Sequence, residues 1–114
     1  KSRIKVSIRL VAGMEVREHC RGAAYRNSDR EFKIKLDSSL KPISLIKCLS
    51  HEMIHIQQWL TDKMEDLFWN RHSVRWGKKI YYPANLSYGK HPWEIQAHKL
   101  EKDLYKSWVK FWNK

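Results

Sequence analysis

The sequence is poor in the features that define several classes of protein. Its 114 residues include only two cysteines, Cys20 and Cys48, which is too few for the disulfide framework of a small secreted domain. Cys48 lies in an apolar stretch, so we expect a buried thiol rather than a disulfide, with a reducing cytoplasm as the default location. No run approaches the roughly 18 apolar residues of a membrane-spanning helix. No signal-peptide pattern opens the chain, and we expect no membrane partner.

Acidic residues are also scarce. Twelve Asp and Glu stand against 23 Lys and Arg, which gives a formal net charge of +11. Such a basic surface favours nucleic acid, anionic lipid or acidic protein partners. It can equally serve to keep a Trp-rich surface soluble. The length suits a single domain over residues 1–114.

Three segments of the first third read as β-strands. Apolar residues alternate with polar ones over residues 4–10 and again over residues 32–36, which is the period of a half-buried strand. Residues 22–25 form a shorter candidate, and the turn residues Asn27 to Asp29 join it to residues 32–36 as a hairpin.

Two helices are predicted in the remainder. Pro42 opens a segment with apolar residues three and four apart up to Leu60. Residues 61–90 have poor periodicity, with one short strand expected at 78–82. A last helix begins near Pro92, with Lys99, Lys102, Lys106 and Lys110 on its wet face. The expected fold is therefore α+β, with a small β-sheet packed on an active-site helix and a C-terminal helix.

The first helix carries the pattern His51-Glu52-Met53-Ile54-His55. Residues four apart project from the same helix face, so both imidazoles can bind one tetrahedral zinc ion. Glu52 lies beside them and can reach a zinc-bound water without being a ligand. Zinc lowers the pKa of such a water towards about 7, and Glu52 can act as the general base for attack on a peptide carbonyl. The alternative is a surface histidine pair on an amphipathic helix.

A catalytic zinc ion needs a third protein ligand and an open position. A histidine four residues after His55 would complete one common pattern, but that position is Trp59. The candidates that remain are His72, His91, Glu94 and His98. We favour Glu94 because it lies in the first turn of the last helix, although the helix dipole alone also favours a Glu there.

Two further residues can support the site. His98 follows Glu94 by one turn and can be a partner of the ligands or a rival ligand. Gln58 lies two turns beyond His51 and can line the cleft or face solvent.

Several of these segments together resemble the SprT-like and phage-encoded zincin metallopeptidases. The resemblance runs through Gly22-Ala23-Ala24-Tyr25, residues 32–36 and the Cys48-Leu49-Ser50 sequence that leads into the His-Glu-x-x-His motif. Trp76-Gly77 and the segment from Pro92 to Ala97 resemble the phage branch. The compact size is similar to minimal gluzincins.

The resemblance implies further properties. In gluzincins the third ligand is a downstream Glu, which supports Glu94, and the strand before the active-site helix aligns the peptide substrate, here residues 32–36. The family also uses a Tyr or His to stabilise the oxyanion, for which this chain offers Tyr81, Tyr82, Tyr88 and His91.

The sequence thus leaves three alternative functions open. The first is a zinc-dependent metallopeptidase with Glu52 as general base. The second is a non-catalytic binding module that contains zinc. The third is a basic, nucleic-acid-associated domain that uses the charge and the Trp residues, although most of these Trp residues have the spacing of a helix core.

Overall fold

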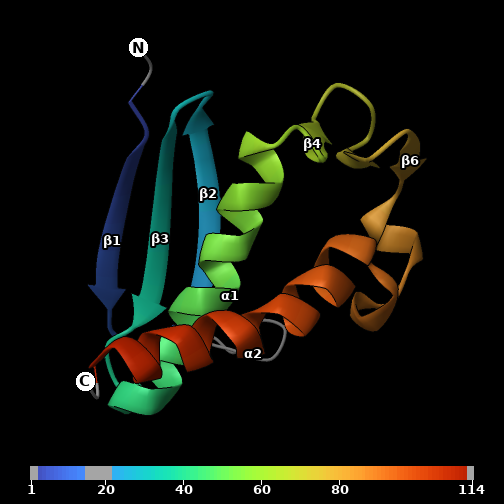
Figure 1. The fold of residues 1–114 in the computed structure, drawn as a ribbon. Coiled ribbons are helices and arrows are strands. Elements are labelled where there is room, and N and C mark those ends of the chain that lie inside the picture. The colour runs from blue at the N-terminus through green and yellow to red at the C-terminus, as the bar shows by residue number, and fades with distance from the viewer. Residues whose placement is uncertain (1–2, 15–21, 113–114) are drawn as a thin grey trace.

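A computed structural model describes residues 3–14 and 22–112, without the side chains of residues 109, 111 and 112. In this part of the chain, two long helices and two small sheets form an α+β fold (Figure 1). No helix among the described residues is long and apolar enough to cross a membrane.

The first sheet contains β1 (Lys5–Val11), β2 (Gly22–Ser28) and β3 (Glu31–Asp37) in the order β1-β3-β2. β3 pairs with β1 in parallel and with β2 in antiparallel fashion. The prediction that residues 32–36 form the substrate-aligning edge is therefore wrong, because β3 is paired on both sides. The sequence predicts the hairpin correctly, but it does not show that β1 occupies the other side of β3. The edge beside α1 belongs to β2 (Figure 1).

Helix α1 (Pro42–Leu60) has the predicted bounds. Proline is at the start of the helix, where its missing N–H costs nothing. The chain leaves the helix at Asp62, whose φ of 59° is left-handed. The helix packs on β2 and β3, and the ring of Trp59 stacks on Phe32 with centroids 6.0 Å apart. This packing places one face of α1 directly beside the β2 edge.

The inner face of the sheet extends beyond the helix that covers it. Ile8 and Leu10 lie level with the buried residues Ile34 and Leu36 of β3. They are nevertheless 51% and 60% exposed, because α1 covers the β2 side of the sheet (Figure 1).

The second sheet lies in the segment between the two long helices. It contains β4 (Met64–Leu67), β5 (Ser73–Trp76) and β6 (Lys79–Tyr81), all antiparallel. Only β6 overlaps a predicted strand, since β4 and β5 have four residues each and no clear alternation. Two short 3-10 turns follow, η1 (Pro83–Asn85) and η2 (Tyr88–Lys90).

Helix α2 (Pro92–Trp112) packs against α1 and crosses its lower half in Figure 1. Ala97 is fully buried at this contact, and the four lysines predicted to face water are exposed: Lys99, Lys102, Lys106 and Lys110. Helix α1 therefore contacts both the first sheet and α2.

Cys48 does not have its predicted state. It is buried on α1 and disulfide-bonded, so the prediction of a free buried thiol is wrong. An apolar environment suits a half-cystine as well as a thiol, so the local pattern did not distinguish the two. Cys20, the other cysteine, lies outside the described residues.

Candidate metal centre

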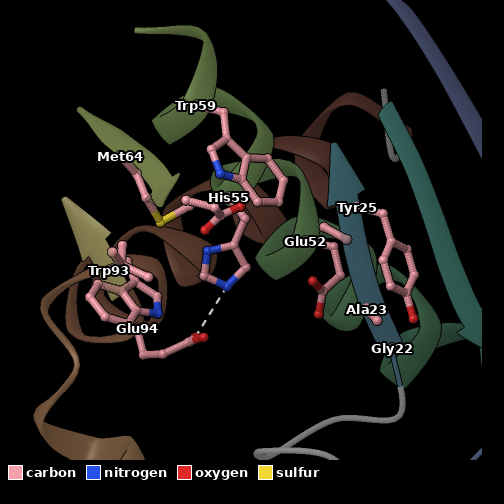
Figure 2. Close-up of a pocket in the computed structure, with 12 residues that line it drawn as sticks. Gly22, Ala23, Tyr25, Glu52, His55, Trp59, Met64, Trp93 and Glu94 are labelled. Atoms are coloured by element: carbon pink, nitrogen blue, oxygen red, sulfur yellow. Dashed lines mark hydrogen bonds and ion pairs between the residues drawn. The ribbon is translucent and has the colours of Figure 1, made fainter. Parts of the chain in front are cut away.

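Three buried side chains meet between α1 and α2: His51, His55 and Glu94, called here the ligand cluster. The Nε2 atoms of the two histidines lie 3.2 Å apart. Glu94 Oε1 lies 2.9 Å from His51 Nε2 and 3.1 Å from His55 Nε2. Figure 2 shows the last contact as a dashed line. One ligand atom from each residue thus converges on one point, and the group could hold a metal ion.

The local structure accounts for this convergence. The two histidines lie one turn apart on the buried face of α1. Glu94 lies in the first turn of α2, where Trp93 anchors the helix start in the core. The Trp93 ring stacks on His91 with centroids 4.8 Å apart and meets Tyr81 edge-on. The start of α2 therefore holds the Glu94 carboxylate against α1.

His51 is oriented by a second carboxylate from α2. Glu101 Oε1 lies 2.8 Å from His51 Nδ1. A carboxylate accepts, so Nδ1 carries the proton and donates, which leaves the Nε2 lone pair directed at the ligand cluster. Glu101 was not among the site residues predicted from the sequence. The available signal was its position seven residues, or two turns, beyond Glu94 on a helix otherwise rich in Lys.

His55 is oriented by Gln58. The Gln58 side-chain N–H₂ donates to the Trp93 carbonyl and to Gln96 Oε1, each at 2.9 Å. Its Oε1 therefore faces His55 Nδ1 at 2.9 Å and accepts from it. The Nε2 lone pair of His55 is again left for the ligand cluster. Gln58 is buried and orients a ligand, so it does not face solvent, and it is not among the residues that line the pocket beside the cluster.

The ligand cluster thus directs three electron pairs at one another inside the protein. Two imidazole lone pairs and a carboxylate oxygen at this separation repel one another unless a cation lies between them. Burial lowers the pKa of His55, but the hydrogen bond and the negative charge of Glu94 outweigh it and raise that pKa to about 9. Burial also lowers the pKa of His51, and Glu94 again raises it overall. The cluster therefore attracts a cation, whether a proton or a metal ion.

Glu52 lies beside the cluster on the open side. It lines a cavity of about 250 Å³ together with His55 and Glu94, called here the central pocket. In Figure 2, Glu52 lies between His55 and the β2 residues Gly22 and Ala23. Burial raises the pKa of Glu52, although the two histidines partly oppose this. A carboxyl group with a raised pKa is suited to accepting and returning a proton.

Tyr88 and His98 lie behind Glu94. The Tyr88 hydroxyl donates to Glu94 Oε1 at 2.9 Å and lies 3.1 Å from His98 Nε2. His98 Nδ1 in turn lies 3.4 Å from Glu101. Neither residue is among those that line the central pocket. Their contacts fit a role in supporting the ligands rather than in contacting a substrate oxygen.

The remaining candidates lie elsewhere. His91 Nε2 contacts the carbonyl oxygens of Pro83 and Leu86, which ties η1 to the start of α2. His72 is at the exposed tip between β4 and β5. Tyr82 is exposed after β6. The structure brings none of these residues, and not Tyr81, into the ligand cluster.

Several residues of the central pocket were not predicted as site residues. β2 contributes residues 22–25, β4 contributes Met64 and Asp66, and α1 contributes Trp59. They come from separate elements, so only the packing of β2 and β4 against α1 brings them together. Tyr25 is the tyrosine that lines the pocket, instead of the four aromatic residues proposed for the oxyanion.

Comparisons of this chain with protein-family models, curated proteins and solved structures found no match.

Proposed function

We propose that this chain is a zinc-dependent metallopeptidase with a minimal zincin-like fold, in which His51, His55 and Glu94 hold the zinc ion. The observation that carries the proposal is the spacing of the three ligand atoms, 2.9, 3.1 and 3.2 Å. At a tetrahedral zinc ion with bonds of about 2.0–2.1 Å, ligand atoms lie about 3.3 Å apart. The described atoms need to separate by only a few tenths of an ångström.

The donor set also supports zinc. Two imidazole nitrogens and one carboxylate oxygen are a common ligand set of catalytic zinc sites, and such sites leave a fourth position open. His55 and Glu94 border the central pocket, so the open position faces a cavity. A closed structural site would instead present a fourth protein ligand there.

The proposed chemistry assigns one task to each group. Bound zinc supplies a Lewis acid that lowers the pKa of water towards about 7. Glu52 accepts a proton at its carboxylate and returns it to the leaving nitrogen of the cleaved peptide bond. Glu101 and Gln58 hold the two imidazoles in the required tautomer, and Tyr88 holds the Glu94 carboxylate.

The substrate is proposed to extend along β2. This strand is the sheet edge beside α1, and four of its residues line the central pocket. An extended peptide can add to such an edge through main-chain hydrogen bonds. It would then pass directly over Glu52 (Figure 2).

Metal analysis and peptide cleavage test the proposal together. The purified protein should contain about one zinc ion per chain, and His51→Ala and Glu94→Ala should lose it. Glu52→Gln should keep zinc and lose cleavage of a mixed peptide library, whereas the exposed control Glu65→Gln should keep both. Cleavage that survives Glu52→Gln would refute the mechanism. Zinc binding without any cleavage would instead support the non-catalytic binding module.

A nucleic-acid-associated role is a second candidate, supported by one exposed feature. Phe68 and Trp69, at the tip between β4 and β5, are 70% and 81% exposed, and Arg71 follows them. Exposed aromatic rings beside cations can stack on unpaired bases. Trp69→Ala should then weaken binding to single-stranded DNA severalfold, and affinity should fall steeply with salt. No binding at low salt would remove this role.

A further inference from the structure

The central pocket has features of a specificity site in addition to the proposed catalytic groups. Away from the ligand cluster, its walls are largely apolar: Trp59, Met64, Val74 and Trp93. Figure 2 shows Trp59 and Met64 on one side of His55 and Trp93 facing the same space. Aromatic rings and a thioether are good contacts for the methylene stem of a long side chain.

Asp66 is the one acid of this pocket outside the proposed catalytic machinery. Three acids line the cavity, and two of them, Glu52 and Glu94, belong to the metal centre. Asp66 also borders an adjacent groove, where it lies near Phe68 and the β2–β3 turn. Its carboxylate is therefore at the junction of the two hollows.

Arg26 does not neutralise Asp66 through a close contact. The Arg26 guanidinium instead donates to Asp29 Oδ1 at 3.3 Å and to the Ser28 carbonyl at 3.4 Å. Burial raises the pKa of Asp66, while Trp59 and then Arg26 oppose this only in part. A partly buried carboxylate of this kind gains from a cation supplied by a ligand.

The indole N–H of Trp59 provides an independent observation. Trp59 is only 8% exposed, and its Nε1 has no hydrogen-bond partner of normal geometry in the described part of the chain. A weak hydrogen bond from Trp59 to the Asp66 carboxyl nevertheless lowers the pKa of that group. A buried donor whose only acceptor contact has poor geometry remains costly. An acceptor that enters the pocket, such as a peptide carbonyl oxygen, would relieve that cost.

We propose that the central pocket selects a basic residue, lysine or arginine, of the peptide substrate through the Asp66 carboxylate. Such a residue supplies a cation for the Asp66 carboxylate. A main-chain carbonyl oxygen, which every peptide residue has, can accept from the Trp59 N–H and adds affinity without selecting the side chain. The aliphatic stem of the basic residue packs on the apolar walls, and its cation also lies beside aromatic rings. The proposal rests on the peptidase function and adds the substrate class.

A neutral or acidic side chain fits this site less well. A neutral side chain leaves the partly buried Asp66 carboxylate without a close cation, and an acidic side chain adds a like charge. The net charge of +11 repels basic peptides at long range, so only the local attraction of the Asp66 carboxylate favours a basic side chain. Basic residues are therefore favoured at one substrate position rather than throughout the substrate.

Peptide binding to zinc-loaded Glu52→Gln protein tests this selection without cleavage. The probe is a set of alanine-based peptides, each with one position occupied in turn by Lys, Arg, norleucine or Glu. At one position of the peptide, the peptides with Lys or Arg should bind about tenfold more tightly than the peptide with norleucine. Adding Asp66→Asn should remove that preference, whereas adding Glu65→Gln, the neighbouring acid outside the pocket, should leave it intact. Trp59→Phe should weaken all the peptides by a similar factor.

The outcomes separate this proposal from the peptidase function. Equal affinity for Lys and norleucine at every position would overturn the specificity site, as would a preference that survives Asp66→Asn. A basic preference in binding, together with wild-type protein that cleaves nothing, would overturn the peptidase function and leave the binding site standing. Thermal unfolding of each variant shows that the comparison is between folded proteins.

Discussion

At the scale of single residues, each imidazole of the ligand cluster has its own hydrogen-bond partner. Glu101 accepts from His51 Nδ1 at 2.8 Å, and Gln58 accepts from His55 Nδ1 at 2.9 Å. Such partners fix the tautomer and the ring orientation, and a carboxylate partner also makes the imidazole a better donor to a metal. The affinity for zinc should therefore depend on residues that do not touch it.

Glu101→Ala tests this dependence. We expect the zinc affinity to fall about 10- to 100-fold, as is typical when an orienting carboxylate is lost. Glu101→Gln keeps an acceptor and should cost less. Competition against a chromophoric chelator measures both constants. Asp103→Ala, an exposed acid on the same helix, is the control, and an equal loss in that variant would show that only the general charge of α2 matters.

Asp66 should reduce stability at neutral pH. Burial raises its pKa above the ordinary value of 3.8, even though Trp59 and Arg26 act in the other direction. The folded state then holds the proton more tightly than the unfolded state, so the ionised carboxylate destabilises the fold at high pH. This destabilisation disappears as the pH falls through the raised pKa towards 3.8.

Asp66→Asn should consequently unfold at a higher temperature than the wild type at pH 7, and the difference should shrink near pH 4. Calorimetry at the two pH values gives the comparison. A variant that is less stable at pH 7 would indicate that attraction to Arg26 outweighs the effect of burial.

The sequence predicted the meeting of His51, His55 and Glu94 because a helical spacing of four and a proline-started helix are local signals. Glu101 and Asp66 could not be chosen in the same way. Their importance depends on how α2 crosses α1 and on how β4 folds back over the pocket. Neither arrangement leaves a period in the sequence.

At the scale of elements, the helices were predicted more accurately than the sheets. The bounds of α1 follow from Pro42 and from an apolar spacing of three and four residues that continues over all 19 residues of the helix. The strand order β1-β3-β2 depends on pairing between distant segments, and alternation within a strand does not reveal which edge remains free. The proposed substrate edge consequently moved from β3 to β2.

Gly22 fixes how closely β2 approaches α1. A Cβ at this position would lie 2.7 Å from Cys48 Sγ, 3.0 Å from Leu36 Cδ2 and 3.2 Å from the Lys35 carbonyl oxygen. A disulfide-bonded sulfur and a backbone oxygen have little freedom to move. The close approach of β2 to α1 at this point therefore requires glycine.

Gly22→Ala should reduce the free energy of unfolding by about 1–3 kcal/mol, the usual cost of overpacking. Denaturant titration measures the change. The matched control is Gly89→Ala, where a new Cβ has no heavy atom within 4 Å. That variant should be neutral or slightly more stable. Similar losses in both variants would contradict a role for the contact with Cys48.

At the scale of the whole molecule, the ligand cluster connects α1, which carries His51 and His55, to α2, which carries Glu94. Zinc that binds the folded state but not the unfolded state stabilises it by about 2.7 kcal/mol when its free concentration is 100 times Kd. For a domain of this size, this corresponds to roughly 10 °C in the unfolding temperature.

Removing zinc with a chelator should lower the unfolding temperature by about that amount, and added zinc should restore it. Glu94→Ala should make the unfolding temperature insensitive to both treatments. A shift of the same size in that variant would place the stabilising metal elsewhere in the chain.

The three proposed ligands all come from α1 and α2, whereas the segment between them supplies Met64, Asp66 and Val74 to the central pocket. On the proposed function, the metal ligands thus come from the helices, whereas Asp66, the acid proposed to select the substrate, comes from the segment between them. Substitutions in the segment between the helices can change which peptides bind while the metal remains in place, provided that Tyr88 keeps its contact with Glu94. The two helices can thus serve as a constant frame on which new specificities evolve or are engineered.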